Sequence, residues 1–273
     1  KQRGILILFD CLFETMQFDT QQNSSSRFLK IAQEMGALDR IVIVDGLSKS
    51  KNFPGERIGW LATTNQDFIA ALTPLVLSRR CNPRLTTGPL IIFEGLARQT
   101  QALQAQDGRV PLSRTIAKVM QTGTYPFSQE TFAQMYAQWS LWDQQTLKFY
   151  QDNLTLTRAV LDGSITGWSP DSAAFNTFVR PSGLEAGTNS IDFLAKLMFT
   201  LATYTQIGPC FGLSQKIWDN RLGVWSRITY ASSRPELVEG LIRLITFSRF
   251  YAERNFGDPD KFPTLNISYD TQV

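Results

Sequence analysis

Two short apolar runs, each ending in an aspartate, constrain the fold of this chain more than any other feature. The runs cover Gly4–Phe9, which is followed by Asp10, and Arg40–Asp45. A helical pattern of apolar residues lies between them at Ser26–Leu38, and Gly36 stands where such a helix would end. Uninterrupted apolar runs are typical of strands covered on both faces, which occur in parallel sheets. We therefore expect Gly4–Phe9 to be a fully buried strand that is parallel to the second run.

The alternation of strand and helix continues beyond the second run. Arg57–Thr63 has the pattern of a third strand, and Asn65–Ser78 and Thr86–Gln106 have the pattern of helices. This order predicts an α/β fold, a three-layer arrangement in which helices flank a mostly parallel sheet. Ligands of such sheets bind at the carboxyl ends of the strands, where Asp10 and the loop after Asp45 are placed.

The second half of the chain has a different character. Asp107–Phe127 lacks a clear period and is predicted to be a lid-like insertion, whereas Ser128–Leu161 is predicted to be one long helix. The remainder predicts a compact α+β unit, with a capping box formed by Ser233 and Glu236. We expect the large domain to cover residues 1–150 and the small domain residues 151–273. The elements predicted in the small domain are strands at 173–181 and 224–232, helices at 190–207 and 234–254, and a turn at 208–213.

Composition excludes several classes of function. The chain of 273 residues contains no histidine, which removes Ser-His-Asp and Cys-His hydrolysis and histidine-ligated metals, and no metal site is predicted. Lys and Arg number 27 against 24 Asp and Glu, so the net charge of +3 is too small to argue for nucleic acid or an anionic membrane. Three cysteines lie far apart, which favours a reduced, cytoplasmic compartment.

The loop Asp45–Trp60, DGLSKSKNFPGERIGW, concentrates cationic and hydroxyl groups between two predicted strands. A lysine at a strand end, such as Lys49, can lose its proton more easily when it is desolvated, and a neutral amine attacks aldehydes. Arg57 and the glycines around it suit a phosphate, and Asp10 ends the neighbouring strand. An amine, a carboxylate and a guanidinium are the groups that pyridoxal phosphate requires of a protein. Surface residues in a solvated loop are the alternative interpretation.

The order GLSKSKNFPGERIG, fourteen consecutive positions from Gly46 to Gly59, closely resembles the lysine signature of class I/II aminotransferases. These are fold-type I pyridoxal-phosphate enzymes similar to aspartate aminotransferase, and most work as homodimers. The resemblance implies that Lys49 carries the cofactor as an internal aldimine and moves the alpha proton of the substrate. It also implies that Ser48 and Arg57 contribute to the cofactor site and that Asp10 pairs with the pyridinium nitrogen. Lys51 falls at an unconstrained position, where we expect a surface residue.

The resemblance covers essentially the whole chain but only the later part of the family's domain plan. Near the other end, Arg227 in WSRITYAS is similar to the family's arginine that binds the substrate alpha-carboxylate. Two positions depart from the pattern: Phe13 replaces a frequent tyrosine, and Gly46 replaces a frequent serine. Family members have well over a hundred residues before the strand that corresponds to the one ending in Asp10. We therefore expect the chain to lack the N-terminal half of that plan.

Three alternatives stay open beside an aminotransferase that acts on an amino acid and a 2-oxo acid. The first is a non-catalytic remnant or binding module with the same fold. The second is another pyridoxal-phosphate reaction, as in a lyase, decarboxylase or racemase, because one scaffold supports many reactions. The third is an acyl-serine hydrolase, since Ser48 and Lys51 satisfy the S-x-x-K spacing, although the partner motifs S-D-N and K-T-G are missing.

Overall fold

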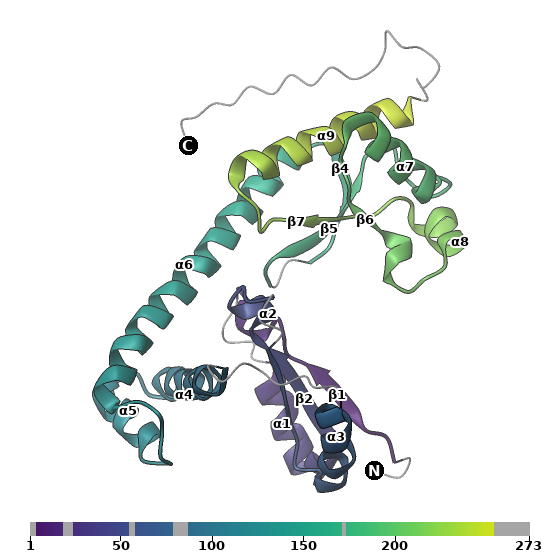
Figure 1. Cartoon of the computed structure of the whole chain (residues 1–273). Helices are drawn as coiled ribbons and strands as arrows, with labels where there is room; N and C mark the ends of the chain where they lie inside the picture. Colours follow the sequence, from purple (N-terminus) through teal and green to yellow (C-terminus); the bar gives the residue numbers. More distant parts are fainter. Residues whose placement is uncertain (1–3, 19–23, 55–57, 79–86, 171–172, 254–273) are drawn as a thin grey trace. The chain divides into compact units, whose positions relative to one another are not determined.

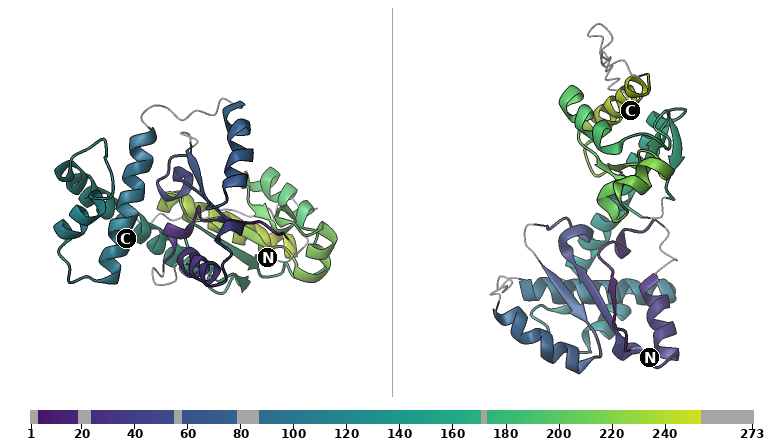
Figure 2. Two further views of the ribbon diagram at one scale, coloured as in Figure 1. Left: turned by 90° about the horizontal axis from the view of Figure 1, so that it is seen from below. Right: turned by 90° about the vertical axis from the view of Figure 1, so that its right-hand side faces the viewer.

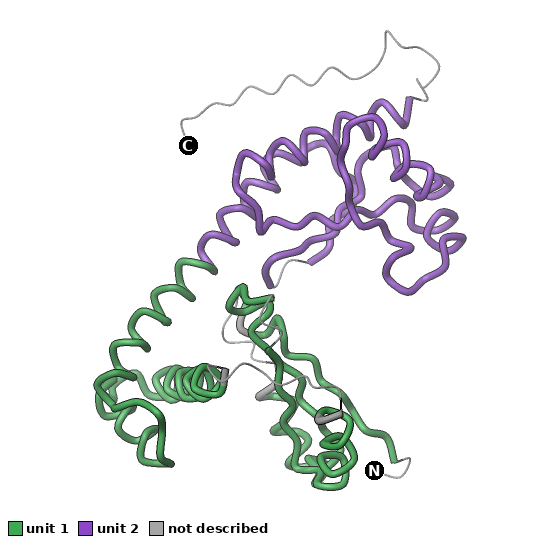
Figure 3. The backbone as a smooth tube through the Cα atoms, viewed as in Figure 1, with its two compact units in different colours: residues 1–146 green, residues 147–273 purple. Residues whose placement is uncertain are grey.

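A computed structural model describes residues 4–18, 24–54, 58–78, 87–170 and 173–253 of the chain. The chain divides into two compact units, residues 1–146 and 147–273, which Figure 3 distinguishes by colour. The division falls within the long helix α6 (Gln129–Leu161). The boundary that the sequence suggests, at residue 150, remains a prediction about functional domains. Each unit is described separately below, and its elements can be followed from further directions in Figure 2.

A three-stranded sheet forms the first part of unit 1 (Figure 1). Strand β2 lies between the other two; it pairs parallel with β1, as predicted, and antiparallel with β3. The antiparallel β3 qualifies the expectation of a mostly parallel sheet. The elements are β1 (Ile7–Asp10), η1 (Glu14–Met16), α1 (Ser24–Glu34), η2 (Leu38–Arg40), β2 (Ile41–Gly46), α2 (Leu47–Ser50), β3 (Gly59–Ala62) and α3 (Gln66–Ser78).

The prediction that Gly4–Phe9 is fully buried was wrong. Side chains of Ile7 and Leu8, which point to opposite faces of the sheet, are 41% and 63% exposed. Within the described residues β1 pairs with β2 alone and is an edge strand, and of its apolar side chains Phe9 stacks on Phe28 of α1. The apolar run correctly predicted a parallel strand, but such a run does not reveal which elements pack against the faces of the strand.

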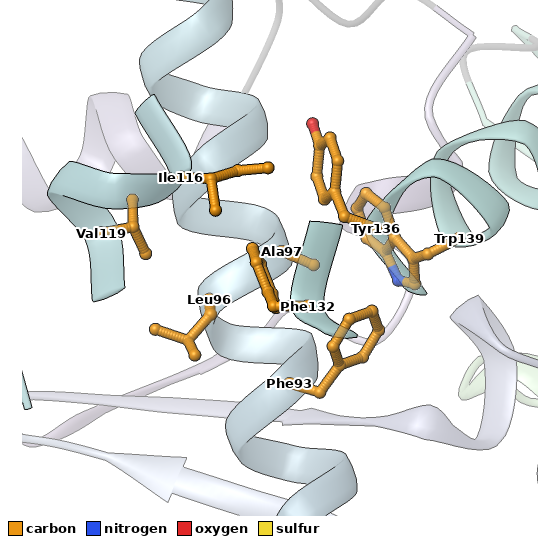
Figure 4. Packing of buried hydrophobic residues seen from close by; sticks show 8 residues of the cluster. All are labelled: Phe93, Leu96, Ala97, Ile116, Val119, Phe132, Tyr136 and Trp139. Atoms are coloured by element: carbon orange, nitrogen blue, oxygen red, sulfur yellow. The ribbon is translucent and has the colours of Figure 1, made fainter. Parts of the chain in front are cut away.

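Three helices build a separate hydrophobic core within unit 1. Helices α4 (Thr87–Gln106), α5 (Leu112–Met120) and α6 surround a cluster of aromatic and aliphatic side chains (Figure 4). The segment 107–127 is therefore no lid-like insertion, because α5 packs the side chains of Ile116 and Val119 into this core. The cluster contains Phe93, Leu96, Ala97, Ile116, Val119, Phe132, Tyr136 and Trp139.

Unit 2 contains a four-stranded antiparallel sheet in the order β4-β5-β7-β6. The capping box of Ser233 and Glu236 is confirmed at the start of α9. The helix predicted to reach residue 207 ends earlier, because Ala202 adopts a left-handed conformation and the following residues join the sheet as β6. The elements are β4 (Ile165–Trp168), β5 (Asn176–Pro181), α7 (Ser190–Leu201), β6 (Gln206–Ile207), η3 (Gly208–Phe211), α8 (Gln215–Ile217), η4 (Trp218–Leu222), β7 (Ser226–Thr229) and α9 (Arg234–Ala252).

Among the described residues, no helix combines the length and the apolar character that a membrane crossing demands.

Candidate functional site

Lys49 lies on α2, a single helical turn that follows β2 without a linker. Backbone hydrogen bonds hold this turn at both ends. The Leu47 N–H donates to the Ile58 carbonyl at 3.2 Å, and the Lys51 N–H donates to the Leu47 carbonyl at 3.2 Å. The Ser50 hydroxyl donates to the Gly46 carbonyl at 3.3 Å. The strand thus leads directly into the turn that presents Lys49 at its carboxyl end.

Gly46 allows the chain to enter this turn because no side chain fits there. A Cβ atom built on Gly46 would lie 2.6 Å from the Ile58 carbonyl oxygen and 3.3 Å from a methyl carbon of Leu12. The Gly46 N–H already donates to the Asp45 carboxylate at 2.7 Å. The sequence difference from the frequent serine is therefore a consequence of the close approach of the residue before β3.

Asp10 and Phe13 lie at the same end of the sheet as Lys49. Asp10 is opposite Val44 in the parallel pair, and its carboxylate accepts a hydrogen bond from the Leu12 N–H at 3.0 Å. The Lys49 amine lies 5.8 Å from the centre of the Phe13 ring, within the range of a cation–π contact. The position where the family often has tyrosine therefore lies beside the lysine amine.

Of the other predicted site residues, only Ser48 shares the turn with Lys49. Ser48 is half-buried on α2, and Arg57 lies outside the described residues. Arg227 belongs to unit 2, where it is opposite Phe178 and Gln206 in the sheet, and its guanidinium lies 5.9 Å from the centre of the Phe211 ring. Arg227 also lines a cavity of about 240 Å³ between the β6–β7 pair and α9.

Lys51 was predicted to be a surface residue, and that prediction was wrong. Its side chain is 8% exposed, and its amine forms an ion pair with Asp143 and lies 3.8 Å from the Glu94 carboxylate. The same amine lies over the rings of Trp139 and Trp142, at 4.2 and 5.1 Å from their centres. Lys51 therefore connects the loop after β2 to α4 and α6.

Arg98 on α4 makes the second half of this buried cluster. It pairs with Asp45, the residue before Gly46, and its Nε donates to Glu94 at 2.8 Å. The Trp139 indole N–H donates to the other Glu94 oxygen at 2.7 Å. We call Asp45, Lys51, Glu94, Arg98 and Asp143 the buried charge cluster; it holds three carboxylates and two cations.

Burial dominates the acid–base properties of this cluster. It raises the pKa of Asp143 and lowers the pKa of Lys51, although the attraction between the two groups opposes both shifts. Burial also raises the pKa of Asp45, against the opposing effects of Arg98 and the Gly46 N–H. Each charge therefore depends on its partners, because removal of one would leave the others desolvated without compensation.

The fold is that of the class I and II aminotransferases, as comparisons with known proteins show. The model of the family described as aminotransferase class I and II matches residues 1–245. The chain belongs to this family. A search among curated protein sequences finds no match.

Solved aminotransferase structures share the fold. An aspartate aminotransferase from Rhizobium meliloti is 21% identical, with 91% of this chain and 50% of that chain covered and a TM-score of 0.56. An aromatic aminotransferase from Pyrococcus horikoshii is 19% identical, with coverages of 93% and 53% and a TM-score of 0.54. An α-aminoadipate aminotransferase from Thermus thermophilus, complexed with N-(5'-phosphopyridoxyl)-L-leucine, is 16% identical, with coverages of 93% and 52% and a TM-score of 0.54. The chain thus spans about half the length of these structures.

Substitution of Gly46 tests the close approach at the start of the turn. Gly46→Ala should destabilise the protein by about 1–3 kcal/mol, because the new methyl group meets backbone that cannot move independently. Gly95→Ala is the matched control, since no atom lies within 4 Å of its added Cβ on α4, and it should be stabilising by about 0.5–1 kcal/mol. Urea denaturation gives both values, and equal effects would contradict the steric explanation.

Lys51→Met tests the buried charge cluster. The variant keeps most of the length of the side chain but leaves Asp143 without its cation, so we expect a loss of about 3–5 kcal/mol. Lys148→Met removes an ion pair to Asp152 from an amine that is 73% exposed, and should cost at most about 1 kcal/mol.

The pH dependence of Lys51→Met gives a second measurement. A carboxyl group whose folded pKa is raised stabilises the protein below its unfolded pKa, and this stability is lost as the pH rises through the folded value. Loss of Lys51 should raise the pKa of Asp143 further. The difference in free energy of unfolding between the wild type and the variant should therefore become smaller as the pH falls from 8 to 5, as measured by urea denaturation. A difference that does not depend on pH would contradict this account.

Cys11 should resist thiol reagents in the folded protein. Burial, with the nearby carboxylates of Glu14, Asp45 and Asp10, raises the pKa of Cys11 to about 12. At pH 8 iodoacetamide should label the exposed Cys210 but label Cys11 only after unfolding, as peptide mass spectrometry reports. Because the folded pKa is raised, the stability contributed by this thiol is complete below pH 9 and is lost as the pH rises towards 12. Labelling of Cys11 at pH 8 without unfolding would contradict the assignment.

Proposed function

We propose that this chain supplies the lysine-bearing part of a pyridoxal-phosphate-dependent aminotransferase that transfers an amino group between an amino acid and a 2-oxo acid. One observation carries the proposal. Of the two lysines in the loop, Lys51 is enclosed by carboxylates and indole rings, whereas Lys49 lies at the carboxyl end of the parallel pair, against Phe13. Lys49 is therefore the lysine that stands where such sheets bind a ligand.

The residues at this end of the sheet fit one side of the cofactor. Gly46 allows the backbone to pass close to the Ile58 carbonyl just before the turn. The polar groups near this end of the sheet are the Lys49 amine, the Ser48 hydroxyl and the Asp10 carboxylate. When bound, pyridoxal phosphate supplies an electron sink for the substrate's alpha carbon. In the proposed arrangement Lys49 anchors the cofactor and moves the proton at the alpha carbon, and Asp10 keeps the ring nitrogen protonated.

Two arginines complete the proposed set of ligands. Arg57, from the same signature, would hold the phosphate together with Ser48. Arg227 would bind the alpha-carboxylate of the substrate through its planar fork of N–H donors. Phe13 has no hydroxyl and so cannot donate the hydrogen bond that a tyrosine would, and its ring lies 5.8 Å from the Lys49 amine.

The comparisons support the reaction class but do not choose the substrate side chain. The similar structures carry the names of aspartate, aromatic and α-aminoadipate aminotransferases, which differ in that side chain. Homodimer formation and a cytoplasmic setting remain predictions from the resemblance and from cysteine usage.

A non-catalytic binding module is the second candidate, and one observation favours it. Phe13 and Gly46 stand where the family frequently has a tyrosine and a serine, so two hydroxyl groups that would contact the cofactor are missing. An acyl-serine hydrolase is less well supported, because the lysine of its S-x-x-K spacing is Lys51, whose amine pairs with Asp143.

Trapping of the cofactor on Lys49 tests the proposal. Incubation of the purified chain with pyridoxal phosphate, followed by borohydride reduction, should add one phosphopyridoxyl group to the peptide that contains Lys49. Lys49→Ala should abolish both this modification and any transamination, whereas Lys148→Ala, at an exposed position, should retain them.

Other outcomes of the trapping experiment would point to other functions or to another lysine. Transamination that survives in Lys49→Ala, or specific attachment at Lys51, would overturn the assignment. A wild-type chain that acquires no group on Lys49 would favour the binding module. Release of a product other than a 2-oxo acid would indicate another pyridoxal-phosphate reaction.

A further inference from the structure

The turn that carries Lys49 is too short to be stable by itself. Helix α2 contains four residues. An isolated helix of this length is unstable in water, because the conformational entropy lost in nucleation outweighs the hydrogen bonds of a single turn. The amides of Lys51 and Phe53 both donate to the Leu47 carbonyl at 3.2 Å. These bonds close the turn, but they do not fix it to the rest of unit 1.

Two buried side chains fix the turn from opposite ends. Asp45 comes just before the turn and pairs with Arg98 on α4. Lys51 comes just after it and pairs with Asp143 on α6. Lys49 lies between these two attachments, so two ion pairs to the helices add to the hydrogen bond between the Leu47 N–H and the Ile58 carbonyl in fixing its backbone position.

The two attachments are joined to one another through Glu94. Its carboxylate accepts from the Arg98 Nε at 2.8 Å and from the Trp139 indole at 2.7 Å, and one of its oxygens lies 3.8 Å from the Lys51 amine. With Glu94 2% exposed, this network is desolvated and its geometry is restricted to a small set of arrangements. A shift of the turn would separate buried opposite charges, which makes the network a stiff support.

We propose that Lys51 is a positioning residue for Lys49: the buried charge cluster holds α2 so that the Lys49 amine is presented at the strand ends. The inference rests on the proposed function of Lys49, and Lys51 itself touches neither cofactor nor substrate. The same contacts explain why a second lysine stands two positions after Lys49 in a loop where a solvated residue was expected.

Local measurements on the full chain test the role without any cofactor. In Lys51→Met, hydrogen exchange at the amides of residue 51 and Phe53 should accelerate by about tenfold or more, because the turn opens without global unfolding. Trace acetylation of Lys49, measured relative to Lys148 in the same sample, should rise by about threefold or more as the amine leaves the Phe13 ring.

Three further variants separate positioning from general stability. Phe132→Leu weakens the helical core at a residue outside the buried charge cluster. It should change neither hydrogen exchange nor acetylation, even where it lowers the global stability as much as Lys51→Met does. Lys51→Arg keeps the charge and should restore wild-type behaviour. If Lys51→Met does not fold, the paired variant Lys51→Met/Asp143→Asn removes both ends of the attachment without leaving an unpaired carboxylate, and should show the same opening.

The outcomes distinguish this inference from the proposed function. Wild-type exchange and acetylation in Lys51→Met or in the paired variant, or equal opening in Phe132→Leu, would overturn the positioning role. Trapping of pyridoxal phosphate on Lys49 is recorded in parallel and should fall by about tenfold in Lys51→Met but not in Phe132→Leu. If the wild-type chain traps none, the proposed function fails, while exchange and acetylation still decide whether Lys51 positions Lys49.

Discussion

The ion pair between Lys51 and Asp143 holds together parts of unit 1 that are distant in the sequence. It connects the loop after β2 to α6, and through Glu94 it reaches α4. Burial makes the attraction strong and also makes separation of the partners costly, since each charge would be left without water. The sheet and the three-helix core are therefore coupled at the point where the chain presents Lys49.

Long periodic elements could be predicted from the sequence. The 33 residues of α6 begin one residue after the predicted start and end at the predicted residue, because apolar and aromatic side chains recur at helical spacing. The capping box before α9 was also recognisable, since both of its side chains act within one turn. Short elements were harder to recognise: β4 has only four residues, of which one is glycine, and α5 has only nine. Their pattern is too brief to establish a period.

The partners of a side chain could not be predicted in the same way. Lys51 stands in a polar loop, where lysines are usually solvated, and its carboxylate partners lie on helices far along the chain. A signal existed in the second partner, because Glu94 interrupts an apolar helical run and Arg98 follows it at four residues. A carboxylate on the apolar face of a helix requires a buried cation, and the sequence alone offers several candidates for that cation.

Some features of the candidate site could likewise be predicted from the sequence, and others could not. The identity and order of Asp10, Ser48 and Lys49 follow from the sequence, because parallel strands bring their carboxyl ends to one edge. The necessity of glycine at position 46 depends on the approach of the Ile58 carbonyl, which sequence spacing does not reveal. The roles of Arg57 and Arg227 stay predictions from the resemblance, because Arg57 lies outside the described residues and Arg227 belongs to the other unit.

Two lysines in one loop raise a question of chemical selectivity that the buried charge cluster answers. Burial lowers the pKa of Lys51, and a larger neutral fraction would by itself make that amine a better nucleophile towards an aldehyde. The same burial surrounds the amine with two carboxylates and two indole rings, so an aldehyde has no approach to it. In the proposed mechanism Lys49 reacts because it lies at the carboxyl end of the parallel strands, whereas Lys51 is buried among its partners and supports the turn. Two lysines that lie two residues apart in one loop can therefore have different roles: in the proposal Lys49 reacts with the cofactor, and Lys51 stabilises the turn.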